Sequence, residues 1–298
     1  MSLVINNNLM AYNTTRNLQT HYGNLANSTR KLSSGLRVDR SADDAAGLAV
    51  RELMRSDISA LHQGTRNAND AISLIQTADG ALQTIDEKLI RMKELAEQAA
   101  TGTYDSVQRM IIDSEYQAMA SEITRISNAT DFNNIKLLDG SLSGAHDGTA
   151  LKSKGQLLVH FGTANDSAED YYYIKIGSTT ASSLGLGNNA GGASKTAGGY
   201  TISTQALAQK SLVAVRNAIV SKDNIRADLG ALQNRLEATV ANVTIQAENL
   251  QASESRISDI DVAKEMTQFI RNQTLANAAT SMLGQANQLP NMALGLIR

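Results

Sequence analysis

The two ends of this chain carry the same apolar repeat, and the middle of the chain lacks it. Near each terminus an apolar residue recurs at every seventh position. A seven-residue period places one apolar stripe along a helix, and that stripe must be covered by another helix. The two ends are therefore predicted to pair with each other, with other copies of the chain, or with both. The repeating positions are Val4, Ala11, Leu18, Leu25 and Leu32 at one end and Val262, Phe269, Ala276 and Leu283 at the other.

The composition permits very long helices. Pro290 is the sole proline among 298 residues, so almost nothing interrupts a helical hydrogen-bond ladder. The absence of cysteine excludes disulfides, thiolate metal sites and cysteine nucleophiles. A net charge of −2 and an aromatic content of 4% argue against a general nucleic-acid-binding protein.

Capping signals divide the terminal helices from the rest of the chain. A first helix is predicted from Leu3 to Ser33, with Gly35 as its C-terminal stop. A last helix is predicted from Ser258 to about Leu283, followed by a short apolar tail after Pro290. Two helix starts share a Ser-x-x-Asp pattern, in which serine caps the helix and aspartate favours its dipole. These starts are Ser41 with Asp44 and Ser258 with Asp261.

A long inner helix is predicted from residue 45 to residue 100. It carries two apolar heptad tracks, which is the pattern of a helix that packs in a bundle. Gly64 and Gly80 interrupt the pattern, and each weakens a helix by about 1 kcal/mol relative to alanine. Helical patterns also follow at 112–126 and from about Thr204 to Leu250. The two tracks are Ala68, Ile75, Leu82, Leu89 and Ala96, and Ala71, Ala78, Ile85, Met92 and Ala99.

The middle of the chain is rich in glycine and lacks the helical periodicity of the two ends. Eleven of the 21 glycines fall within 141–199. Within this stretch, 156–161 and 171–176 are rich in β-branched and aromatic residues and predict two strands, and 131–140 predicts an extended piece ending in a turn. The fold is therefore predicted to be mainly α: a nested bundle of long helices from both ends of the chain, with a small β-rich insertion.

No residue pattern predicts catalysis, a cofactor or a metal site. The four histidines, His21, His62, His146 and His160, have no ligand-like spacing. The carboxylate pairs Asp43–Asp44 and Asp259–Asp261 lie at predicted helix starts, where capping explains them. The sequence thus favours a structural protein over an enzyme.

The N-terminal residues predict neither a cleavable signal peptide nor a membrane anchor. The first eight residues lack a hydrophobic core, and no apolar run reaches ~18 residues. The first 38 residues are basic and free of Asp and Glu, as in organelle-targeting peptides. The seam that runs on to Leu32, with a matching segment at the far end of the chain, favours a structural helix instead.

Several motifs at both ends resemble those of bacterial flagellins. The N-terminal motifs are LSSGLRVDRSADDAAGLAV (32–50), TRNANDAISLIQTADGAL (65–82), RMKELAEQAATGT (91–103) and ATDFNNIKLLDG (129–140). The C-terminal motifs are ADLGALQNRLEATVANV (227–243), ENLQASESRISDIDVAKEM (248–266) and ANQLPNMALGLIR (286–298).

The resemblance implies a structural subunit that polymerises into the helical flagellar filament for swimming motility. It implies export without a cleavable signal peptide, through a type III system, to the extracellular flagellum. It also implies three regions: an inner terminal-helix domain (1–44 and 255–298), a helical bundle with a small β element (45–140 and 200–254), and an outward-facing Gly/Ser-rich β insertion (141–199).

The resemblance implies partners besides other copies of the chain: an export chaperone, filament cap proteins, hook-junction proteins and the animal Toll-like receptor for flagellin. The positions that match the receptor-contact residues of many flagellins are Arg91, Leu95 and Glu115. The positions that resemble the tail read by cytosolic sensors are Leu294, Leu296, Ile297 and Arg298. Neither nucleic acid nor a membrane is an expected partner.

Three alternatives compete with a filament subunit. A hook–filament junction protein shares flagellin-like ends, although the bundle motifs at 129–140 and 227–243 favour the filament protein. An enzyme carried in the insertion would need a metal or triad pattern, which 141–199 lacks. A cytosolic coiled-coil adaptor would form discrete dimers rather than polymers.

Overall fold

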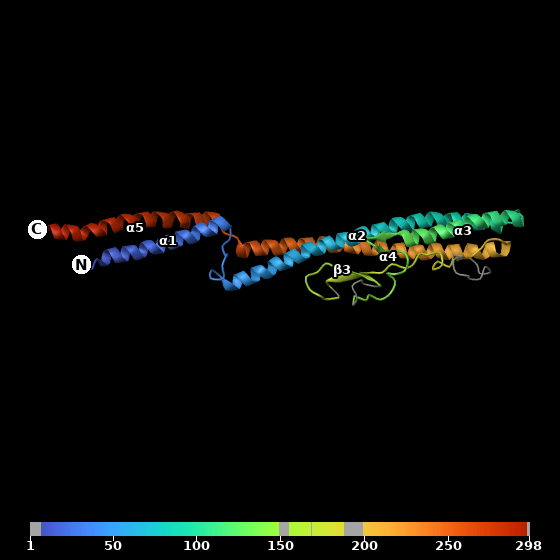
Figure 1. Cartoon of the computed structure of the whole chain (residues 1–298), viewed down its shortest axis with the longest axis horizontal. Coiled ribbons are helices and arrows are strands. Elements are labelled where there is room, and N and C mark those ends of the chain that lie inside the picture. The colour runs from blue at the N-terminus through green and yellow to red at the C-terminus, as the bar shows by residue number, and fades with distance from the viewer. Residues whose placement is uncertain (1–6, 149–154, 168, 188–198, 297–298) are drawn as a thin grey trace. The chain divides into compact units, whose positions relative to one another are not determined.

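The computed structural model describes residues 7–148, 155–167, 169–187 and 199–296, with the side chains of the last helix placed as far as residue 288 (Figure 1). Five long helices and four short strands make up the described chain. In order these are α1 (Leu9–Ser34), α2 (Ala45–Ala100), α3 (Ser106–Ala129), β1 (Asp131–Phe132), β2 (Ile135–Lys136), β3 (Leu157–His160), β4 (Tyr171–Ile174), α4 (Gln205–Ser258) and α5 (Val262–Leu296). The mainly α fold with a small β insertion is confirmed.

The chain divides into two compact units. The terminal unit comprises the residues up to Ile58 and those from Glu248 onward, and the central unit comprises Ser59–Ala247. The division falls within α2 and α4, because each of these helices contributes to both units.

In the terminal unit, α1 and α5 lie side by side and antiparallel (Figure 1). At one end of the pair, the side-chain amide of Asn8 donates to the carbonyl oxygen of Ala286 at 2.8 Å. At the other end, the backbone N–H of Ile260 donates to the carbonyl oxygen of Gly35 at 3.1 Å. The expected pairing of the two chain ends is therefore present within a single chain.

In the central unit, α2, α3 and α4 surround one apolar core. Both predicted tracks of α2 are buried in this core along their whole length, which confirms the prediction that they form the packing face of the helix. Tyr116 and Ile123 enter the core from α3, and Leu229 and Leu236 enter it from α4. The period of seven thus identified the buried face of a helix that spans 56 residues.

Two antiparallel hairpins complete the central unit. In the first, β1 pairs with β2 across a turn whose residues Asn133 and Asn134 have φ values of 49° and 61°. Asparagine tolerates this left-handed geometry, which matches the twist of a tight hairpin. In the second, β3 pairs with β4, with Leu157 opposite Ile174 and His160 opposite Tyr171. This second hairpin confirms the two strands predicted in the insertion.

The inner face of the second hairpin belongs to the same core as the helices. Val159 and Ile174 are buried in it, and Phe161 packs in a tilted arrangement on Tyr172. The guanidinium of Arg235 on α4 lies 3.6 Å from the centre of the Tyr172 ring, a cation–π contact. The described part of the insertion is therefore anchored on the bundle.

Several predicted helix boundaries are wrong. The first helix begins at Leu9 rather than Leu3, because the Asn8 side chain accepts a hydrogen bond from the N–H of Ala11 at 3.0 Å and caps it. Its end is confirmed: Gly35 takes the left-handed conformation, with φ 72°, and donates to the carbonyl of Lys31.

Neither predicted serine cap is used. Asp44 accepts from the N–H of Gly47 at 2.9 Å, and Asp261 accepts from the N–H of Lys264 at 3.1 Å. In both cases the aspartate three residues later is the cap, and Ser258 is instead the last residue of α4. A carboxylate accepts hydrogen bonds from the first backbone N–H groups of a helix as well as a hydroxyl does. The Ser-x-x-Asp pattern therefore predicted the position of each helix start correctly but the capping residue wrongly.

The last helix is also longer than predicted. It continues beyond Leu283 and through Pro290 to Leu296. Proline removes one backbone hydrogen bond of a helix, and here that loss does not end it.

Candidate functional site

The pairing face of α1 and α5 contains most of the predicted seam. Ala11, Leu18, Leu25 and Leu32 are half-buried on α1, as are Phe269 and Leu283 on α5, and Ala276 is buried. Val262 stands 58% exposed at the start of α5. Val4 lies outside the described residues. The structure thus brings seven of the nine predicted seam positions to one interface.

The same interface also contains polar side chains. On α1, positions Thr14, His21 and Ser28 form a second track three residues after Ala11, Leu18 and Leu25, and all three are at least half-buried. The Nδ1 atom of His21 is buried without a hydrogen-bond partner. An interface of mixed character buries less apolar surface than a purely leucine-lined seam, so the pair gains less from the hydrophobic effect.

Large apolar side chains also lie on the outside of this helix pair. On α1 they extend to Tyr12, and on α5 Ile270 is 54% exposed. By helical periodicity, Ile270 and Met282 flank the buried stripe of α5 on opposite sides, so one partner helix cannot cover both. Of these positions, the heptad repeats in the sequence include Val262 alone, because each repeat follows one track along its helix. The exposed residues are Leu9, Met10, Tyr12 and Tyr22 on α1, and Val262, Met266, Ile270, Leu275 and Met282 on α5.

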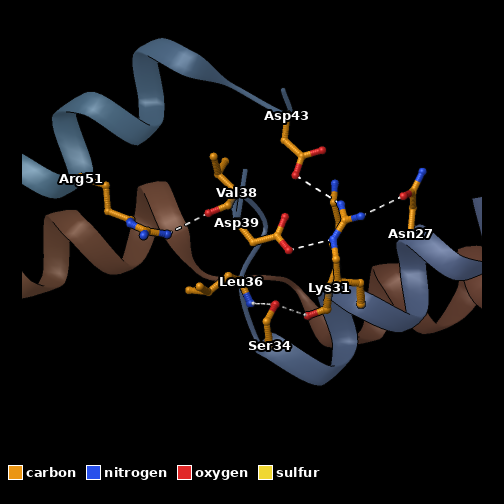
Figure 2. Close-up of polar contacts among 9 residues, drawn as sticks. Asn27, Lys31, Ser34, Leu36, Val38, Asp39, Asp43 and Arg51 are labelled. Carbon is orange, nitrogen blue, oxygen red and sulfur yellow. Dashed lines mark hydrogen bonds and ion pairs between the residues drawn. The ribbon is translucent and has the colours of Figure 1, made fainter. Parts of the chain in front are cut away.

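A network of polar contacts holds the segment that joins α1 to α2. Figure 2 shows Asp39, Asp43 and Asn27 converging on one guanidinium, that of Arg30. The Nε of Arg30 lies 2.7 Å from a carboxylate oxygen of Asp39. Burial by itself would raise the pKa of Asp39, but hydrogen bonds with Asp43 and Arg30 outweigh it, so this pKa lies below its ordinary value.

The joining segment is also tied to its neighbours within the terminal unit. The buried Arg51 of α2 donates to the carbonyl of Val38 at 2.8 Å (Figure 2). Arg37 donates from its backbone to Ser258 at 2.7 Å and from its side chain to Ile257 at 2.5 Å. These contacts tie the segment to the start of α2 and to the end of α4, and we name the segment 35–44 with its partners the junction.

The structure brings two of the three predicted receptor residues together. Arg91 on α2 donates from Nε and Nη2 to one oxygen of Glu115 on α3, at 2.9 and 2.8 Å, and its other branch reaches Glu94. The hydrogen bonds that Arg91 donates to Glu115 and, with a smaller effect, to Glu94 raise the pKa of Arg91 above its ordinary value. Leu95 is separate from this pair: it is 1% exposed and lies in the core.

The remaining predicted site residues cannot be placed. The side chain of Leu294 and that of Leu296 lie outside the described residues, as do Ile297 and Arg298. Among the described residues, no group of three or more His, Asp or Glu side chains could hold a metal ion. None of the described helices is long and apolar enough to cross a membrane.

Comparisons with known proteins identify the family. Residues 5–143 match the bacterial flagellin N-terminal helical region, and residues 212–297 match the bacterial flagellin C-terminal helical region. The chain belongs to the bacterial flagellin family. Flagellins are structural proteins of the bacterial flagellum, so this chain is a subunit of the extracellular flagellar filament that assembles with its own copies, and it is not an enzyme.

Whole-length relatives agree with the two family matches. The chain is 39% identical to flagellin FlaB2 of Treponema pallidum over 296 residues, covering 99% of this chain and 100% of the relative. It is 40% identical to the flagellar filament 33 kDa core protein of Treponema phagedenis, with the same coverage. It is also 40% identical to a flagellin of Bacillus subtilis, covering 99% of each chain.

Proposed function

We propose that the paired helices α1 and α5 form the surface through which copies of this flagellin join in the filament. The observation that carries the proposal is the set of large apolar side chains left exposed around that pair. Monomeric proteins seldom expose so many neighbouring apolar side chains, and such a surface marks an interaction site. Covering it contributes roughly 25 cal/mol per Å² of apolar area buried, before ordering costs.

The distribution of these side chains favours an open polymer over a closed dimer. Ile270 and Met282 lie on opposite flanks of the buried stripe of α5, and Leu9 and Tyr12 lie on the outer side of α1. One neighbour cannot cover all of these faces. Contacts between different patches on successive copies build an open helical assembly when the rotation from one copy to the next does not close a ring.

In this assembly, the three predicted regions have separate places. The segments 1–44 and 255–298 form the inner tube, 45–140 and 200–254 form the surrounding bundle, and 141–199 faces outward. The terminal helices are only weakly held in a lone copy, because their pairing face mixes polar and apolar residues. Their full ordering accompanies assembly.

Further partners follow from the same surfaces. An export chaperone covers α5 before secretion, and cap and hook-junction proteins contact the same terminal helices at the filament ends. The Toll-like receptor for flagellin contacts the Arg91–Glu115 pair, whose side chains are 48% and 44% exposed. Leu95 supports this surface from within the core. The C-terminal residues 294–298 are the segment read by cytosolic sensors.

Assembly of a charged variant tests the principal proposal. Ile270→Asp places a carboxylate on the exposed flank of α5, and Val220→Asp is the matched control on the exposed face of α4 in the central unit. Sedimentation and electron microscopy after seeding should show filaments for the control and the unaltered chain, and monomers for Ile270→Asp. Normal filaments from Ile270→Asp, or equal failure of both variants, would overturn the proposed role of α5.

A further inference from the structure

One core position of α4 holds a lysine. The buried residues of this helix recur at every seventh position, and Lys222 is the sole charged member of that track. Its side chain is fully enclosed, with only 1% of the residue exposed. Apolar periodicity in the sequence does not identify this position, because lysine is a charged residue. The track is Ala208, Val215, Lys222, Leu229, Leu236 and Val243.

Carboxylates neutralise the buried charge. The Nζ of Lys222 lies 2.5 Å from a carboxylate oxygen of Asp86 on α2 and 2.7 Å from one of Asp223. One turn further along α4, Arg226 makes two contacts with Asp79 on α2, at 2.7 and 3.1 Å. Two ion pairs therefore connect α2 to α4 at fixed points along their lengths.

The apolar core by itself specifies the register of these helices poorly. Both helices carry strict heptad tracks of similar residues, so a slip of one heptad returns apolar positions to apolar positions. Such a slip moves one helix by about 10 Å, from seven residues at 1.5 Å each. Repetitive seams of this kind need a polar element to exclude the alternatives.

The residues one heptad away from the two aspartates show what each slip would do. Lys93 lies seven positions after Asp86, and Ile72 lies seven positions before Asp79. A slip in one direction places the buried Lys222 against Lys93. A slip in the other direction places Arg226 against Ile72. Each slip therefore keeps one ion pair between the helices and leaves the other cation without a carboxylate on α2.

We propose that Lys222 and Arg226, with Asp86 and Asp79, form a register lock that holds α2 and α4 in one axial alignment. The lock does not serve stability, because replacing a buried ion pair by apolar residues is often neutral or stabilising. Its role is specificity, as for a lysine at a single core position of a coiled coil. A fixed register gives every subunit the same length along these helices.

Distance measurements between spin labels test the lock in the full-length monomer. The chain has no native cysteine, so cysteines introduced at the exposed positions Gln76 on α2 and Asn217 on α4 are labelled specifically. These positions are offset along the helices, so a slip changes their separation by several ångströms. The test variant is Lys222→Met with Arg226→Gln, and the control is Arg125→Gln, which breaks an exposed ion pair within α3.

The expected result is one distance population for the unaltered chain and the control, and a second, shifted population for the test variant without loss of thermal stability. If the test variant does not fold, Asp86→Asn with Lys93→Asp decides the question. That pair moves the carboxylate by one heptad, and Lys93 is exposed. It should populate the slipped register. A single unshifted population in either folded variant would overturn the proposal.

Discussion

The carbonyl group of Phe161, at the end of β3, packs directly on the backbone of Gly64 in α2. A Cβ atom at position 64 would overlap that carbonyl group. Beside it, Asn67 donates from its side chain to the carbonyl of His160 at 2.9 Å. Glycine at this position lets the hairpin dock on the helix, which explains why a residue that weakens the helix is found there.

Two glycines of α2 should therefore respond to alanine in opposite directions. Gly64→Ala should destabilise the central unit by about 1–3 kcal/mol, because the new methyl group forces the hairpin away. Gly80→Ala should stabilise it by about 1 kcal/mol, since nothing lies within 4 Å of the added atom. Thermal unfolding of the monomer measures both changes. Stabilisation by both substitutions would contradict the docking contact.

Substitution of Leu95 should lower the folding stability of the central unit rather than remove a surface contact. Leu95→Ala removes a fully buried side chain and should destabilise the central unit by about 2–5 kcal/mol. Arg91→Ala removes surface contacts with Glu115 and should change stability by less than about 1 kcal/mol. Unfolding curves distinguish the two. In a receptor reporter assay at a temperature where both variants are folded, Arg91→Ala should lose more signal than Leu95→Ala.

The junction should lose stability in acid. The pKa of Asp39 is lowered in the folded chain, so its contribution is fully present above its unfolded pKa, near 3.9, and is lost as the pH falls through the lower folded value. Asp39→Asn should therefore lower the melting temperature of the terminal helices at neutral pH, and this difference should shrink below pH 4. Circular dichroism melts at several pH values provide the measurement.

A matched substitution separates the junction from general charge effects. Asp228→Asn removes an exposed carboxylate from the outer face of α4. It should leave the melting temperature nearly unchanged across the same pH range. A constant effect of Asp39→Asn at every pH would contradict the role assigned to its ionised form.

Local periodicity predicted the parts of this fold that depend on single helices. The two tracks of α2 from Ala68 to Ala99 are buried as expected, because a heptad period identifies one face without knowledge of its partner. The two strands predicted at 156–161 and 171–176 were also found, since these stretches are rich in β-branched and aromatic residues. Both serine caps were wrong because serine and aspartate satisfy the same backbone donors.

Features that join distant parts of the chain could not be predicted in this way. From the sequence alone, Gly64 is expected only to destabilise the helix. Its role depends on the carbonyl group of Phe161, a residue distant in sequence that packs against it. From the sequence alone, a lysine is expected to be exposed to solvent. The burial of Lys222 follows only from the buried positions seven residues before and after it on α4. The apolar residues of α5 are distributed around the whole helix in the sequence. A prediction based on one heptad track does not include those on the outer face.

Hydrogen exchange of the terminal helices tests the central claim most directly. Amide exchange in α1 and α5 should be fast in the dilute monomer and strongly slowed in the filament, while exchange in the buried stretches of α2 and α3 should be slow in both. That result is expected if other copies cover the exposed faces of the pair. Terminal helices that are equally protected in the lone chain and in the filament would contradict the account.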